Sequence, residues 1–163
     1  MMSTGRFEIG PALAAVEEQA ARAGASGKAD WSRLFYGHFC LKFDGQDYGG
    51  TEHALGLTYR ILEALSSLVF RGKDRAFIEF VESVHCVGFR IEDRGEALIV
   101  SHADRSDRVF SAPDAVSGPI PLREFATAVH QCHLELCDQA VRMYPGQFTR
   151  ANHSAIPYSD HLI

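Results

Sequence analysis

The chain has 163 residues, the usual size of one domain, and a domain of this length buries roughly 68 to 70% of its unfolded surface. Its 46% hydrophobic and 23% charged residues exclude global disorder. A formal net charge of −5 argues against non-specific binding to nucleic acid, because the chain as a whole repels phosphate backbones.

Cysteine usage and hydropathy indicate where the protein resides. The four cysteines form no CxxC pair, and a chain of this length folds without disulfides, so we expect reduced, buried thiols. The N-terminus lacks a basic region followed by an apolar stretch, and no segment approaches the about 18 apolar residues that a membrane helix needs. These features predict a cytoplasmic protein that does not enter a membrane.

The first predicted element is a helix over residues 11–22. Proline suits the first helical turn, and Leu13, Val16 and Ala20 repeat at helical spacing. The segment that follows is rich in Ala, Gly and Ser, which is typical of a loop. We expect a single domain over residues 1–163, with an N-terminal helix and linker (1–30), a core (31–146) and a C-terminal tail (147–163).

A tight hairpin is predicted next. Apolar residues recur at every second position over residues 34–43, which indicates a strand with one apolar face. Asp44 and Gly45 both tolerate the positive φ angles that a two-residue hairpin turn requires. The return strand is expected to be short, because Gly49 and Gly50 end it.

The central helix is predicted to follow Thr51, whose hydroxyl can accept a hydrogen bond from a free backbone amide as an N-cap. Leucines recur around more than half of its circumference, and the helix is expected to end near Arg71 and Gly72. Such a wide apolar surface indicates that a sheet covers one side of the helix and another helix covers the second.

Residues 76–102 are predicted to be strands, with a turn at residues 93–95 that closes an antiparallel hairpin. Residues 77–82 fit both helical and strand spacing, and their β-branched and aromatic content favours a strand. Val109 and Phe110 are predicted to form one more short strand before a connection rich in proline and glycine.

A long amphipathic helix is predicted over residues 122–144, and Pro145 and Gly146 end it. The tail after it has scattered apolar residues, and we expect it to dock loosely on the body or on a second copy. The order of elements predicts an α+β fold: a mostly antiparallel sheet of about five to six strands, including two hairpins, packed against two long helices with an N-terminal helix appended.

Basic residues and glycine motifs do not predict a phosphate or nucleic-acid site. The group Arg71, Lys73 and Arg75 is interrupted by Asp74, and we interpret it as a solvated turn. The sequence contains no glycine-rich phosphate loop and no GxSxG nucleophile motif. We therefore expect no nucleic-acid partner and no cofactor.

His130, His133 and Cys137 are the best metal candidates, because positions i, i+3 and i+7 of a helix lie near one face and imidazole and thiolate are zinc ligands. The three residues lie in or beside the apolar stripe of the last helix, without a second ligand pair. We interpret them as core or interface residues and predict no metal.

Two cysteines have a histidine close by in sequence. His38 and Cys40 share a face of the first strand, whereas the adjacent His85 and Cys86 point to opposite faces of theirs. No third orienting group can be identified for either pair, and a cysteine in a strand is typical of a small core residue. We therefore expect no cysteine nucleophile.

Asp44, Asp47 and Glu52 cluster around the first hairpin and the start of the central helix. Turn formation accounts for Asp44 and the helix dipole for Glu52, so we interpret the group as an exposed acidic recognition surface rather than an active site. The leading hypothesis is a non-catalytic protein-binding module. The chain resembles small bacterial immunity or antitoxin proteins in being small, acidic, α+β and poor in catalytic motifs, and such proteins occlude a partner protein.

Two alternatives stay open. One is a small-molecule-binding protein or enzyme with a pocket between the sheet and the last helix, in which His130, His133 and His38 supply the polar groups. The other is a homodimer formed through a sheet edge or through the apolar tail.

Overall fold

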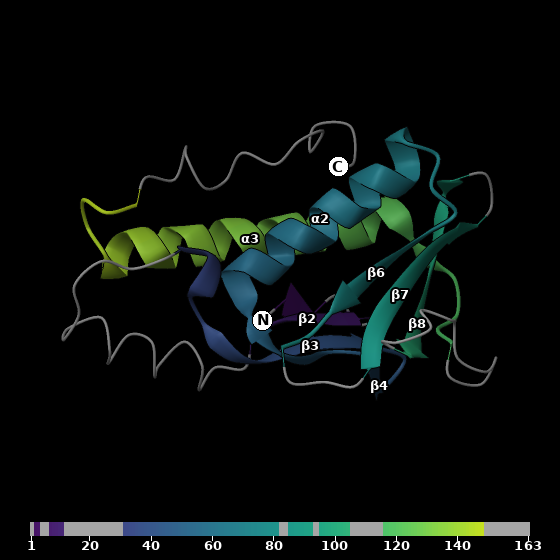
Figure 1. Ribbon diagram of the computed structural model, residues 1–163, viewed down its shortest axis with the longest axis horizontal. Helices are drawn as coiled ribbons and strands as arrows, with labels where there is room; N and C mark the ends of the chain where they lie inside the picture. Colours follow the sequence, from purple (N-terminus) through teal and green to yellow (C-terminus); the bar gives the residue numbers. More distant parts are fainter. Residues whose placement is uncertain are drawn as a thin grey trace.

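The computed structural model describes residues 2–3, 7–11, 31–81, 85–92, 95–104 and 116–148. The fold is α+β, with two antiparallel sheets and two long helices in these ranges (Figure 1). Of the predicted first helix, Pro11 belongs to a strand and the rest lies outside the described residues. The predicted strand at Val109 and Phe110 and the tail from residue 149 onward also lie outside them.

The first sheet is built around the predicted hairpin. Its strands are β1 (Met2–Ser3), β2 (Phe7–Pro11), β3 (Tyr36–Phe43), β4 (Gln46–Asp47) and β5 (Gly50–His53). The order is β1-β2-β3-β4, and β5 also pairs with β3. Strands β1 and β2 are not predicted from the sequence; β2 extends the sheet on the side of β3 away from the hairpin.

The hairpin turn is confirmed. Asp44 and Gly45 have φ angles of 48° and 87°, and the flanking residues Phe43 and Gln46 are paired. The return strand β4 is short, as predicted, and ends at Asp47; what the sequence does not predict is that pairing resumes at Gly50 in the register that β4 began. At Gly49 the two strands approach so closely that an added Cβ would meet the Phe39 carbonyl oxygen at 1.9 Å.

Helix α2 (Ala54–Phe70) begins later than predicted. Thr51 and Glu52 belong to β5 and are paired with β3, so Thr51 is not the N-cap and Glu52 is not in the first helical turn. The strand hydrogen bonds continue to the helix start, where the Ala54 amide donates to the Phe35 carbonyl oxygen at 3.1 Å. The predicted end is confirmed by a C-cap at Arg71.

The second sheet contains β6 (Arg75–Glu79), β7 (His85–Glu92), β8 (Ala97–Asp104) and β9 (Ile120–Pro121), in that order. It confirms the predicted antiparallel hairpin, and it places Phe77 in a strand rather than a helix. The prediction of one sheet is wrong: among the described residues, the strands before α2 and the strands after it pair only within their own set and form two sheets.

Helix α3 (Leu122–Met143) confirms the last predicted helix and lies beside α2 (Figure 1). Its Phe125 ring is fully buried at the centre of the core. It contacts Phe7 and Phe43 of the first sheet at centroid distances of 6.3 and 5.7 Å, and Phe89 of the second sheet at 6.0 Å. One aromatic side chain of α3 thus joins the helix layer to both sheets.

The two sheets also meet directly. Tyr48, at the junction of β4 and β5, stacks on His102 of β8 at 4.9 Å. The Val81 amide, just after β6, donates to the Thr51 carbonyl oxygen of β5 at 3.1 Å. In the described part of the chain, neither helix combines the length and the apolar content needed to cross a membrane.

Candidate functional site

The three carboxylates of the predicted acidic surface differ in their environment. Asp44 is exposed at the hairpin turn, and the side chain of Asp47 is 35% exposed. Glu52 is buried, with only 4% of the residue exposed, so the expectation that it lies on the surface is wrong. Alternation along β5 turns Glu52 inward, and a carboxylate buried in this way requires a cationic partner.

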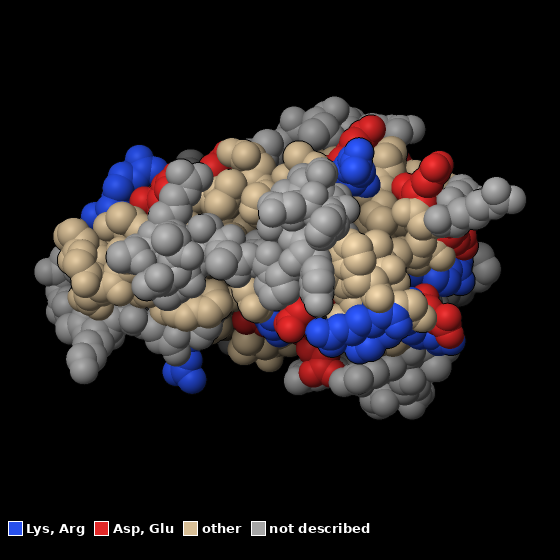
Figure 2. Space-filling view, turned by 90° about the horizontal axis from the view of Figure 1, so that it is seen from above, with Lys and Arg blue, Asp and Glu red and all other residues tan. Residues whose placement is uncertain are grey.

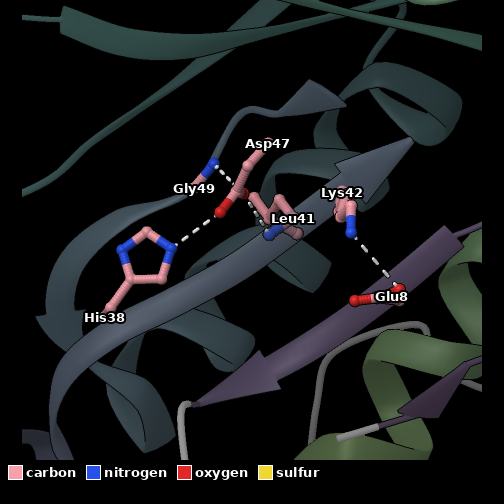
Figure 3. A network of polar contacts seen from close by, with 6 residues as sticks. All are labelled: Glu8, His38, Leu41, Lys42, Asp47 and Gly49. Atoms are coloured by element: carbon pink, nitrogen blue, oxygen red, sulfur yellow. Dashed lines mark hydrogen bonds and ion pairs between the residues drawn. The ribbon is translucent and has the colours of Figure 1, made fainter. Parts of the chain in front are cut away.

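Asp47 organises the distorted part of the hairpin (Figure 3). Its Oδ1 accepts hydrogen bonds from the Leu41 amide at 3.0 Å and the Gly49 amide at 2.8 Å, and its Oδ2 lies 2.7 Å from His38 Nε2. Burial opposes ionisation, but the Gly49 amide, His38 and the Leu41 amide outweigh it and lower the pKa of Asp47. The Asp47 carboxylate therefore takes the place of a backbone carbonyl oxygen as hydrogen-bond acceptor. Its role in the hairpin is structural.

His38 and Cys40 do not form a nucleophile pair. His38 Nε2 is directed at Asp47, and burial raises the pKa of the Cys40 thiol, with the charges of Asp47 and Glu8 acting in the same direction (Figure 3). A thiolate is therefore disfavoured at this position. Beside it, Lys42 of β3 forms an ion pair with Glu8 of β2 at 3.5 Å.

All four cysteines are buried, and none of them forms a disulfide. The Cys86 Sγ lies 3.6 Å from the Ala103 carbonyl oxygen on the neighbouring strand, which fits a small core residue, and the side chain of His85 lies outside the described part. Burial raises the pKa of Cys132 to about 12. A raised pKa disfavours the thiolate, so Cys132 is not an activated nucleophile.

The His130, His133 and Cys137 group does not converge on a metal position, and the described residues contain no cluster that could hold an ion. His133 is fully buried; its Nδ1 lies 2.8 Å from Thr58 Oγ1 and its Nε2 lies 3.5 Å from Cys137 Sγ. The Thr58 hydroxyl also lies 3.0 Å from the Leu55 carbonyl oxygen.

One proton arrangement satisfies this buried chain. Cys137 donates to His133 Nε2, His133 Nδ1–H donates to Thr58, and the Thr58 hydroxyl donates to the carbonyl oxygen of the preceding helical turn. With both ring nitrogens in these contacts, His133 links α2 to α3. His38 lies on the exposed face of β3, so the histidines of the predicted sheet-to-helix pocket are not brought together.

A cavity of about 430 Å³ lies between α2 and β6, and we call it the α2–β6 groove. One wall is a single face of α2, formed by Arg60, Glu63, Ala64, Ser67 and Arg71. Lys73 of the following turn and residues 75–78 of β6 form the other wall. The walls therefore carry four cationic side chains and one carboxylate, in a chain whose formal net charge is −5.

Two contacts fix the guanidinium of Arg60 at the edge of this groove. Its Nη2 lies 2.5 Å from Oε2 of the buried Glu52, and its Nη1 donates to the Glu79 carbonyl oxygen at 3.4 Å. The other oxygen of Glu52 accepts a hydrogen bond from the His53 amide at 2.9 Å. The inward turn of Glu52 thus fixes one cation at the edge of the groove.

Arg71 and Lys73 are exposed on the turn, and no carboxylate of the described ranges forms an ion pair with either. On the face shown in Figure 2, Lys and Arg side chains gather in a strip bordered by Asp and Glu. Next to Arg71, Val69 and Phe70 expose 39% and 43% of their surface. Neither Val69 nor Phe70 lines the groove, which is therefore a polar, positively charged surface.

The sequence does not predict this site. Arg71, Lys73 and Arg75 alone have the pattern of a solvated turn, and Arg60 lies outside that group in the chain. A signal does exist, because Arg60 and Arg71 share a helix face three turns apart, and the positions between them on that face are small or polar. Comparison with known proteins adds no assignment: no family model, no curated protein and no solved structure matches the chain.

Proposed function

We propose that this chain is a non-catalytic protein-binding module that takes an acidic segment of another protein into the α2–β6 groove. The observation that carries the proposal is the lining, in which four cationic side chains face one carboxylate despite the net negative charge of the chain. A local field of this sign attracts an acidic partner and repels a second copy of a chain that is itself acidic.

The surroundings of the groove favour a protein segment as the occupant. The lining of the groove itself includes the apolar side chains of Ala64, Ala76 and Phe77, and protein interfaces combine such an apolar contact with a polar rim. A single small anion needs no apolar surface of this kind. The proposal keeps the expectation of an immunity-like or antitoxin-like protein that occludes its partner, and moves the recognition surface from the acidic hairpin to the basic groove.

The test is a binding titration with two labelled peptides. A fluorescein-labelled octaglutamate peptide is titrated with the protein and followed by fluorescence anisotropy, and an octalysine peptide of equal length is the negative control. We expect binding of the acidic peptide alone, with an affinity that falls as salt is added, because ion pairs at an exposed surface are screened.

The double variant Arg71→Glu, Lys73→Glu reverses two charges of the groove and is expected to weaken binding at least about tenfold. Arg123→Glu is the matched control, because Arg123 is an exposed arginine of α3 that does not line the groove. Equal losses in the double variant and the control, or no binding of the acidic peptide to the native chain, would contradict the proposal.

A further inference from the structure

The α2–β6 groove has two distinct ends. Strand β6 runs back along α2, so the turn that carries Arg71 and Lys73 forms one end of the groove (Figure 1). Arg60 and Glu63 lie toward the other end, where the Arg60 guanidinium reaches the carbonyl oxygen of Glu79, the last residue of β6. The rise of a helix places Arg71 about 16 Å beyond Arg60 along the axis of α2.

The turn end of the groove is positively charged. Arg71 and Lys73 are exposed, and no carboxylate of the described ranges forms an ion pair with either; Asp74 of the same turn does not line the groove. Their amides both donate to the Ser67 carbonyl oxygen, at 3.2 and 3.5 Å, so the backbone that carries the two cations is fixed to the helix end. The two side-chain charges exceed the partial negative charge of about half a unit at the carboxyl end of a helix.

The Arg60 end of the groove has the opposite balance. The charge of Arg60 is compensated by its ion pair with the buried Glu52. Glu63, on the same face of α2, is exposed, and no cation of the described ranges forms an ion pair with it. This end therefore carries one uncompensated negative charge. Between the two ends, the helix wall consists of Ala64 and Ser67, which are uncharged.

A segment that lies along the groove meets both ends, and complementary charges fix the register of such a segment. Glu63 and Arg71 are about 12 Å apart along the helix axis, which an extended chain spans with about four residues. We infer that the groove recognises a segment in which a group of acidic residues is followed or preceded, about four positions away, by a basic residue. The acidic group lies on Arg71 and Lys73, and the basic residue lies on Glu63. The groove then selects the order of charges along the segment in addition to its net charge.

This inference rests on the proposed function, and the experiment separates the two. Two fluorescein-labelled nonapeptides have the same composition of Glu, Lys, Gly and Ser. The segregated peptide begins with three Glu and has its single Lys four positions after the last of them; in the mixed peptide, this Lys and the middle Glu are exchanged. Fluorescence anisotropy at low salt is expected to show about fivefold tighter binding of the segregated peptide, because the mixed peptide places its Lys beside the cations of the turn.

A substitution at Glu63 tests the negative end directly. Glu63→Gln removes the negative charge and is expected to reduce the preference for the segregated peptide to about twofold or less, while the octaglutamate peptide still binds. Glu135→Gln is the matched control, because Glu135 is an exposed glutamate of α3 that does not line the groove, and it is expected to keep the preference. Thermal unfolding curves show that both variants are folded.

Each outcome has one meaning. Equal affinity of the native chain for the two nonapeptides, or failure of both to bind while octaglutamate binds, overturns the inferred order of charges and leaves the proposed function standing. A preference that survives in the Glu63→Gln variant, or that falls equally in the Glu135→Gln variant, overturns the assignment of the basic residue to Glu63. Failure of the nonapeptides and of octaglutamate to bind overturns both the inference and the proposed function.

Discussion

Replacement of Asp47 tests how one carboxylate holds the first hairpin together. Both backbone amides bind the same oxygen, Oδ1, while His38 faces Oδ2. Asp47→Asn keeps an acceptor at Oδ1 and places an amide nitrogen toward His38, so all three contacts have a counterpart. Asp47→Ala removes them all and leaves the amides of Leu41 and Gly49 without their acceptor.

The free-energy change follows from which groups lose a partner. The Leu41 amide is part-buried and the Gly49 amide is near the surface, so water replaces the acceptor only at Gly49. An unsatisfied buried donor costs about 1 to 3 kcal/mol and a net hydrogen bond about 1 kcal/mol. We expect Asp47→Ala to lower the free energy of unfolding by about 2 to 3 kcal/mol, and Asp47→Asn by about 1 kcal/mol or less.

Urea unfolding followed by circular dichroism measures both changes, with Asp44→Asn as the control on the exposed carboxylate of the same hairpin. Because the folded state lowers the pKa of Asp47, its charge stabilises the fold above the ordinary value of 3.8 and this contribution is lost as the pH falls below that value. The difference between the native chain and Asp47→Asn is therefore expected to shrink in acid. Equal losses for Asp47→Ala and Asp47→Asn at neutral pH would refute the role assigned to Oδ1.

Two further substitutions test the close contacts of the fold. Gly49→Ala places a methyl group 1.9 Å from the Phe39 carbonyl oxygen, so we expect a loss of about 3 kcal/mol or more in urea unfolding, and a loss below about 1 kcal/mol would show that the strands separate freely there. Thr58→Val leaves His133 Nδ1 without its partner in the core and is expected to cost about 1 to 3 kcal/mol. Adding His133→Leu to Thr58→Val is expected to bring no further loss of stability, and additive losses in the double variant would contradict the hydrogen-bonded chain.

The elements that the sequence predicts well are those with a strong local signal. Asp44 and Gly45 dictate their own turn because their φ angles are positive, and the periodicity of the two long helices follows directly from the faces they bury. Phe77 is in a strand, as its β-branched and aromatic neighbourhood predicts. In each case the residues that decide the structure are close together in the chain.

The errors come from contacts that local patterns do not contain. Two consecutive glycines, Gly49 and Gly50, predict the end of a strand, yet pairing with β3 resumes at Gly50. Between the two paired segments, the Asp47 side chain supplies the hydrogen-bond acceptor that the distorted backbone lacks. Thr51 has the chemistry of an N-cap, but pairing with β3 keeps it in a strand. Glu52 is predicted to be exposed because the sequence does not show that Arg60 meets it.

The candidate site also shows this difference between local sequence signals and contacts that form only in the fold. His133 and Cys137 are both buried, which fits the interpretation of the His130, His133 and Cys137 pattern as core packing. The groove is not predicted from the sequence because its charged residues come from two segments, and neither segment alone contains a pattern that indicates a binding site. Only the placement of β6 against α2 makes Arg60, Lys73 and Arg75 line one groove.

The unbroken register of β4 and β5 has a consequence for how this chain can vary. Hairpin loops usually accept insertions, but one extra residue between Gly45 and Gly50 would turn every following side chain of β5 to the opposite face. Glu52 would then point outward, and Arg60 would lose the carboxylate that holds it. The length of a surface hairpin thus sets the orientation of a cation on a different element, so insertions and deletions there are expected to alter the groove without touching its lining.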